Sequence, residues 1–311
     1  MSRAAGGDLD RERTAMRIPA RDTPYARPAG ARPVRHVVAF FVLTYLLTWL
    51  AWVPAGLAAR GVLELHVPGL VLLVVGGLGP LVAAVAVATW SRGRAGVAAL
   101  FRQLDPRRTA KRWYAAALLL LPVNLAPAAW VALTTADGPS TGDMTQALAV
   151  LPFQVVFVAL VGGGLDEEMG WRAFALPALL GRRHVPVLVN VGLGVAWALW
   201  HLPLWLDPAS AHAAYPVWLY VLKTVGLSVL IGWMYAGSGG SLLVAVLAHA
   251  VSNSADGARY QLLGERSADL DGQLVLTAAT LAAAAAVTYL TRGRLGADRL
   301  RAPAPDRPSR A

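Results

Sequence analysis

Long apolar stretches alternate with short polar segments along most of the chain. A helix that crosses a bilayer needs about 20 predominantly apolar residues. The fourth stretch is long and contains charges, and the seventh is short. The pattern predicts an all-α, polytopic integral membrane protein with about eight transmembrane helices, at residues 37–58, 67–90, 113–135, 152–180, 185–206, 214–236, 240–257 and 273–291.

The composition agrees with a membrane protein and excludes several other classes. Hydrophobic residues make up 56% of the 311 residues and charged residues only 15%, against about 25% charged in an ordinary soluble domain. The chain has no cysteine. A disulfide scaffold, a cysteine-based zinc site and a thiol nucleophile are therefore excluded.

The basic residues are concentrated in alternate segments between the apolar stretches. With the N-terminus placed inside, the predicted cytoplasmic segments hold 23 of the 28 basic residues. Such a bias follows the positive-inside rule and predicts that both termini are cytoplasmic. Membrane topology thus accounts for the net charge of +10, and nucleic-acid binding is not expected.

This topology divides the chain into a helical domain between two basic tails. Residues 1–35 combine arginines with prolines and are expected to form a disordered basic cytoplasmic tail. The helical domain covers residues 36–291, with its polar motifs within 150–257, and residues 292–311 form a second basic cytoplasmic tail.

Polar and ionisable residues interrupt three of the apolar stretches. Ionisable groups are costly inside a bilayer, so those that occur there are candidates for function. The three clusters are Asp166-Glu167-Glu168 with Arg172, Trp197 with His201, and His249 with Asn253.

The three clusters are expected to lie at similar depths in the membrane. Counted from the inner turns at 1.5 Å per residue, Glu167 is about 21 Å, His201 about 25 Å, His249 about 13 Å and Asn253 about 20 Å from the inner face. Neighbouring antiparallel helices would then bring these side chains to one site.

The spacing within each cluster suggests local pairs. Glu168 and Arg172 are four residues apart on one helical face, as in an intrahelical ion pair. Glu167 points about 100° away and is free to act as a general base. His249 and Asn253 are also four apart and supply either two hydrogen-bond donors for an oxyanion or two metal ligands.

Lys223 is the other basic residue inside a predicted span, besides Arg172. It either extends outward to the membrane surface or pairs with an acid, and the sequence leaves its role open.

The ordered set of motifs resembles the CPBP family of intramembrane proteases. The set consists of Glu167-Glu168-x-x-x-Arg172, an aromatic residue (Trp197) four positions before His201, and His249-x-x-x-Asn253. The family includes the CAAX prenyl endopeptidase Rce1 and the bacterial Abi, or bacteriocin self-immunity, proteins. The resemblance covers residues 150–257, and Trp197 stands where the family usually has phenylalanine.

The resemblance implies an intramembrane endopeptidase. It assigns Glu167 as the base that activates a water molecule, His201 as a residue that holds this water, and His249 and Asn253 as the oxyanion site. Glu168, with Arg172, would brace the site.

The resemblance leaves open whether a metal takes part. A divalent metal such as zinc would be bound by Glu167, His201, His249 and Asn253. In that case Glu168 would have to serve as the base.

The expected partners are the lipid bilayer and a membrane-associated protein or peptide substrate, with the protein spanning the bacterial plasma membrane several times. Two other functions stay open: a transporter with intramembrane charges, and a non-catalytic immunity or scaffold protein. The identity of the substrate and the oligomeric state are not encoded in these motifs.

Overall fold

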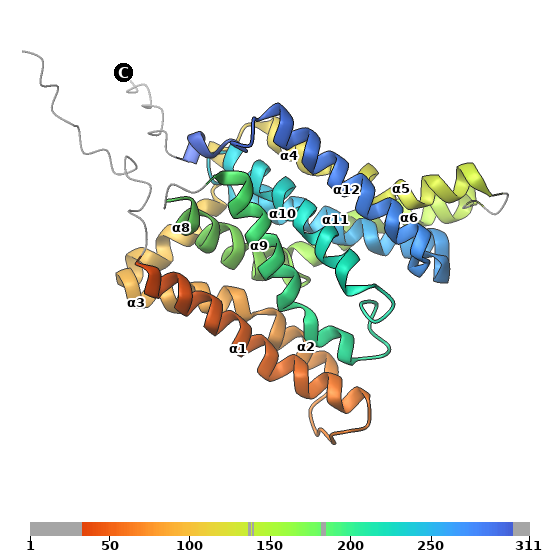
Figure 1. Cartoon of the computed structure of the whole chain (residues 1–311), viewed down its shortest axis with the longest axis horizontal. Coiled ribbons are helices and arrows are strands. Elements are labelled where there is room, and N and C mark those ends of the chain that lie inside the picture. Colours follow the sequence, from red (N-terminus) through yellow and green to blue (C-terminus); the bar gives the residue numbers. More distant parts are fainter. Residues whose placement is uncertain (1–32, 136–137, 139, 182–184, 301–311) are drawn as a thin grey trace, which may run out of the picture.

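The computed structural model describes residues 33–135, 138, 140–181 and 185–300, and the regular elements within these ranges are all helices (Figure 1). The all-α fold class is therefore confirmed. The α-helices in these ranges are α1 (Val34–Ala59), α2 (Gly69–Gly77), α3 (Gly79–Phe101), α4 (Lys111–Leu118), α5 (Leu120–Thr134), α6 (Thr141–Val161), α7 (Gly164–Gly170), α8 (Leu176–Leu180), α9 (Pro186–Trp200), α10 (Val217–Gly237), α11 (Leu242–Leu263) and α12 (Leu270–Leu290).

Among the described residues, six helical segments are long and apolar enough to cross a membrane: α1, α4–α5, α6, α9 with the turn that follows it, α10 and α12. The pair α2–α3, bent by 40°, adds a seventh if it forms one span. A multi-pass membrane protein is thus confirmed, whereas the count of eight and the cytoplasmic placement of the termini stay predictions.

The predicted span 152–180 is wrong as a single helix. Helix α6 begins at Thr141, after Ser140 and Asp143 close a capping box, and it ends at Val161. Gly163 follows with a φ of +104°, which interrupts the helix, and α7 begins at Gly164. Because the flanking residues are apolar on both sides, the hydrophobic pattern runs through this break without marking it.

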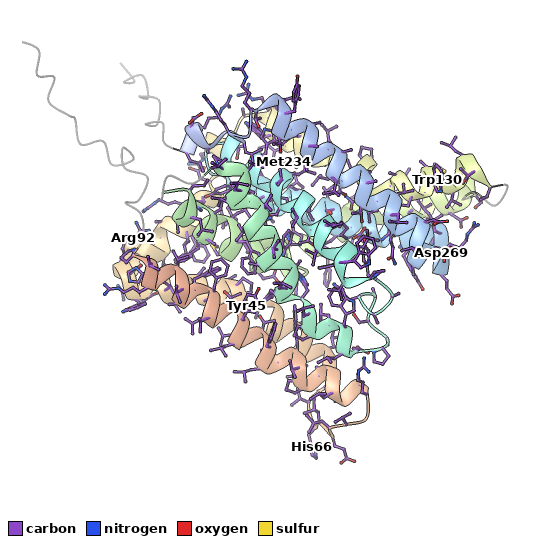
Figure 2. The ribbon with its side chains drawn as sticks, in the orientation of Figure 1. Tyr45, His66, Arg92, Trp130, Met234 and Asp269 are labelled. Atoms are coloured by element: carbon purple, nitrogen blue, oxygen red, sulfur yellow. The ribbon has the colours of Figure 1, made fainter. Side chains whose placement is uncertain are left out.

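Consecutive long helices run in opposite directions, so the bundle has two distinct ends (Figure 1). Arg92 and His66 lie at these opposite ends (Figure 2). The end that carries Arg92 also holds Arg35, whose guanidinium lies 5.9 Å from the ring centre of Trp90. Arg182 and Arg183, which are predicted to be cytoplasmic, lie outside the described residues.

Helix α11 passes through the middle of the bundle and contacts α4, α5, α6, α7 and α10 (Figure 1). Alanines on α11 are completely buried and let neighbouring backbones approach closely. This central helix carries His249, which is itself 2% exposed.

The predicted tails are described only in part. Residues 1–32 and 301–311 lie outside the described ranges. Residues 297–300 form a short helix whose Arg299 Nη1 donates to the carbonyl oxygen of Gly237 at 3.1 Å. The beginning of the C-terminal segment therefore packs against the end of α10.

Close packing of α9 on α10 should make Gly194 sensitive to substitution. A Cβ at Gly194 would lie 2.7 Å from Val225 Cα and 2.9 Å from Ser228 Cβ, whereas a Cβ at Gly192 would meet nothing within 4 Å. We expect Gly194→Ala to destabilise the protein by about 1–3 kcal/mol through overpacking. Thermal unfolding in detergent measures this change, with Gly192→Ala as the matched control that keeps its stability; equal loss in both variants would contradict the packing.

Candidate functional site

The break between α6 and α7 places three acids close to α9 and α11. The backbone N–H of Gly163 donates to Asp166 Oδ1 at 3.0 Å, which fixes the first turn of α7. Gly170, at the other end of α7, lies close to the backbone of Pro80 on α3. Glu167 and Glu168 are thereby held at fixed, different orientations in the interior.

Glu168 is bound by two partners from separate helical segments. Its Oε1 accepts from Arg172 Nη1 at 2.8 Å and lies 2.7 Å from His249 Nδ1. Since an ionised carboxylate only accepts hydrogen bonds, Nδ1 of His249 is the donor. The ion pair expected from the spacing is formed, and it extends to α11. The side chains of Glu168 and Arg172 have no exposed surface.

Glu167 faces α9 instead. Its Oε2 accepts from the indole N–H of Trp197, and its Oε1 lies 4.0 Å from His201 Nε2. His201 Nδ1 lies 2.9 Å from the carbonyl oxygen of Trp197, which orients the imidazole ring. The prediction that Glu167 is free of the Glu168–Arg172 pair is confirmed.

Gly163 lies directly beside the reactive groups. A Cβ at this position would be 2.8 Å from His249 Nε2 and 2.9 Å from Glu167 Oε1. These two polar atoms therefore face the same small volume, and glycine is the residue that leaves this volume free. Together with His201, they form a compact polar centre from α7, α9 and α11.

Trp197 contacts several members of this centre. The Arg172 guanidinium lies 4.4 Å from the centre of its ring, and the ring of His249 packs edge-on against it at 5.2 Å. A phenylalanine would keep both ring contacts but has no N–H to donate to Glu167. The departure from the usual family residue thus adds a hydrogen bond to the carboxylate.

Asn253 lies at the edge of the site, next to the helix break. Its Nδ2 donates to the carbonyl oxygen of Gly162 at 3.3 Å. His249 and Asn253 therefore contact the same neighbouring segment, as their spacing predicts. Asn253 also satisfies a carbonyl that the interrupted helix leaves without its usual partner.

Two aromatic residues next to His201 were not found from the sequence. The ring of His212 stacks on His201 at 5.7 Å, and Tyr220 packs edge-on at 5.5 Å. Burial lowers the pKa of His212 to about 4, so its ring is neutral near pH 7. A single histidine in a loop carries no periodic signal that would have indicated this contact.

Lys223 forms an ion pair in the structure. Its Nζ lies 3.1 Å from Asp256 Oδ2, and Asp256 also binds Arg259 at 3.4 Å. Of the two roles left open by the sequence, pairing with an acid is the one observed.

Three of the four candidate metal ligands, Glu167, His201 and His249, meet in the polar centre, and Asn253 lies at its edge. Nδ1 of His249 donates to Glu168, which leaves Nε2 facing the polar centre, and the amide of Asn253 donates to the Gly162 carbonyl. Within the described residues, no three His, Asp or Glu side chains are grouped so that they could hold a metal ion. In the described part of the chain these side chains are therefore not arranged as a preformed metal site.

Comparisons with known proteins support the resemblance seen in the motifs. Residues 149–255 match the family described as type II CAAX prenyl endopeptidase Rce1-like. A relative named CAAX prenyl protease 2, from Methanococcus maripaludis, is 26% identical over 105 residues, which cover 32% of this chain and 38% of the relative. The matching region contains all of the candidate site residues, and the resemblance to this family of proteases is confirmed.

The buried ion pair predicts a large loss of stability when Arg172 is neutralised. Arg172→Gln would leave the Glu168 charge buried with only His249 as partner, and breaking such a pair costs about 3–5 kcal/mol. Thermal unfolding in detergent should show this loss for Arg172→Gln. The double variant Glu168→Gln with Arg172→Gln should lose less stability than the two single variants lose when their losses are added. Arg294→Gln, whose ion pair with Asp298 is exposed, is the control with little change; an equal loss there would contradict the interpretation.

Proposed function

We propose that this protein is an intramembrane endopeptidase that hydrolyses a peptide bond of a membrane-associated protein or peptide. The observation that carries the proposal is the opposed pair of Glu167 Oε1 and His201 Nε2, 4.0 Å apart beside His249. The match of residues 149–255 to a protease family supports it independently.

Glu167 Oε1 and His201 Nε2 are suited to hold one water molecule between them, with Glu167 as the base. A separation of 4.0 Å is too long for a direct hydrogen bond but allows one bridging water. His201 uses Nδ1 toward the Trp197 carbonyl, so Nε2 is left as an acceptor. Such a water donates one proton to Nε2 and the other to Glu167, and its lone pair is free to attack a carbonyl carbon.

Glu167 acts as the general base in this mechanism. It takes a proton from the water as the oxygen adds to the scissile carbonyl, and it then delivers this proton to the leaving amine nitrogen. The hydrogen bond from Trp197 holds the carboxylate toward α9, so that Oε1 faces the water.

His249 and Asn253 form the oxyanion site in this proposal. His249 Nε2, when protonated, points into the volume beside Gly163, and Asn253 Nδ2 lies at the helix break, where it donates to the Gly162 carbonyl. Both are donors, as a developing oxyanion requires. Glu168 and Arg172 are positioning residues, because they hold His249 through Nδ1 and do not face the water.

The substrate and the location complete the proposal. The relative is named as a CAAX prenyl protease, but the match covers only part of it, so we propose the broader class of membrane-associated proteins or peptides. We place the protein in a bacterial plasma membrane. The buried site among spanning helices limits access to chains that enter the membrane.

Removal of the proposed base should stop cleavage without loss of the fold. We expect Glu167→Gln to lower the rate of cleavage of a quenched membrane peptide by at least about 100-fold, as is typical for loss of general base catalysis. Glu64→Gln, at an exposed position in the loop after α1, is the matched control. Retained cleavage in Glu167→Gln would exclude this role, and a biological effect that persists without cleavage would favour a scaffold or immunity protein.

The arrangement of the candidate ligands predicts that activity does not depend on a metal. Because no three His, Asp or Glu side chains of the described residues are grouped as a metal site, we expect the purified protein to cleave at an unchanged rate after incubation with a chelator. Metal analysis of the same sample checks the interpretation. A stoichiometric metal content, with activity lost on chelation and restored by zinc, would contradict it.

A further inference from the structure

An apolar groove opens on the side of the bundle between α1, α8 and α9. It has a volume of about 540 Å³. Its lining residues are all apolar: Phe41, Leu179, Val185, Leu188, Val189, Gly192 and Leu193. The groove lies outside the polar centre formed by α7, α9 and α11.

The groove leads from the surface of the bundle into the core. Leu188 at its edge is 64% exposed, whereas Leu193 is 1% exposed. Phe41, on the opposite wall, packs against Trp171 with ring centres 6.1 Å apart. The groove therefore has an open side and a closed, well-packed floor.

Both long walls are membrane-spanning helices, so the open side faces hydrocarbon. α1 and α9 are among the helices long and apolar enough to span a bilayer. No lining side chain offers a strong hydrogen-bond donor or acceptor, and a Cβ at Gly192 would meet no atom within 4 Å. The groove suits a flexible hydrocarbon chain better than a peptide, whose polar backbone would find no partners there.

Basic residues lie near the first turn of α9, where the groove begins. A Cβ at Gly293 would be 3.5 Å from Val187 Cγ1 in the first turn of α9. Arg292 and Arg294 flank this glycine, and both are exposed; Arg294 lies 3.9 Å from Asp298 in an exposed ion pair. Exposed arginines at a membrane surface attract anionic headgroups.

We propose that this groove binds an acyl chain of an anionic phospholipid, with the phosphate of the headgroup near Arg292 and Arg294. The bound chain fills the space beside Gly192 and packs against Phe41 and Leu193. Leu193 is one helical turn from Trp197, so the lipid supports α9 directly behind the proposed active site. The inference concerns lipid binding and does not depend on the proposed peptidase activity.

Thermal unfolding of the full-length protein in detergent tests this site. Dioleoyl phosphatidylglycerol is titrated into the delipidated protein, and dioleoyl phosphatidylcholine, with the same chains and a neutral headgroup, serves as the comparison. We expect a saturable rise in Tm with phosphatidylglycerol. Native mass spectrometry should show a bound phosphatidylglycerol at the same lipid concentrations.

Two sets of variants locate the effect. Gly192→Trp fills the groove and should abolish the rise in Tm, whereas Gly69→Trp, at another glycine with nothing within 4 Å, should retain it. Arg292→Gln with Arg294→Gln should weaken the apparent affinity by about tenfold or more, since each basic residue near an anionic surface contributes appreciably. Arg102→Gln with Arg107→Gln, at exposed positions after α3, is the charge-matched control.

Four results would overturn the proposal. An equal rise in Tm with both lipids would show that the anionic headgroup is not recognised. An unchanged rise in Gly192→Trp would show that the lipid does not bind in the groove. An equal loss in the Arg102 and Arg107 control shows only general surface attraction. Displacement of the bound lipid by a substrate peptide in the mass spectrum assigns the groove to substrate. If Gly192→Trp does not fold, the variant Arg292→Gln with Arg294→Gln tests the site alone, because both side chains lie on the surface and their replacement keeps the fold.

Discussion

The buried charge of Glu168 is the constraint on which the rest of the site depends. A carboxylate among apolar helices is tolerated when its charge is matched and its oxygens are bonded. Glu168 meets this requirement with Arg172 from its own helical segment and His249 from α11. The same contacts fix the distance between α7 and α11 and orient the His249 ring, so stability and the geometry of the site have one origin.

The interrupted helix before Glu168 gives neighbouring acids different surroundings. The left-handed Gly163 ends α6, and Asp166 bonds back to its N–H, so α7 starts in a fixed direction. Glu167 then faces α9 while Glu168 faces α11. Irregular backbone at membrane depth is tolerated where protein covers it, and Asn253 contributes by bonding the Gly162 carbonyl.

The region that matches the protease family contains the polar centre but not all of the helices that pack around it. Residues 149–255 include the site residues, whereas α1, α3 and α12 lie outside this range. Pro80 on α3 lies against Gly170, and Trp52 on α1 packs 5.9 Å from His201. Helices α1 and α3 therefore form part of the wall around the site, and α1 also forms one side of the apolar groove.

The sequence alone determined what depends on local spacing. Apolar length predicted the spanning helices, and the four-residue spacing of Glu168 and Arg172 predicted their ion pair, because both are properties of a single helix. Contacts between helices needed the tertiary structure: the break at Gly163 has apolar flanks on both sides that hide the end of α6, and His212 reaches His201 from a loop. These contacts are decided by how whole helices pack, since each depends on residues distant in sequence that no local period relates.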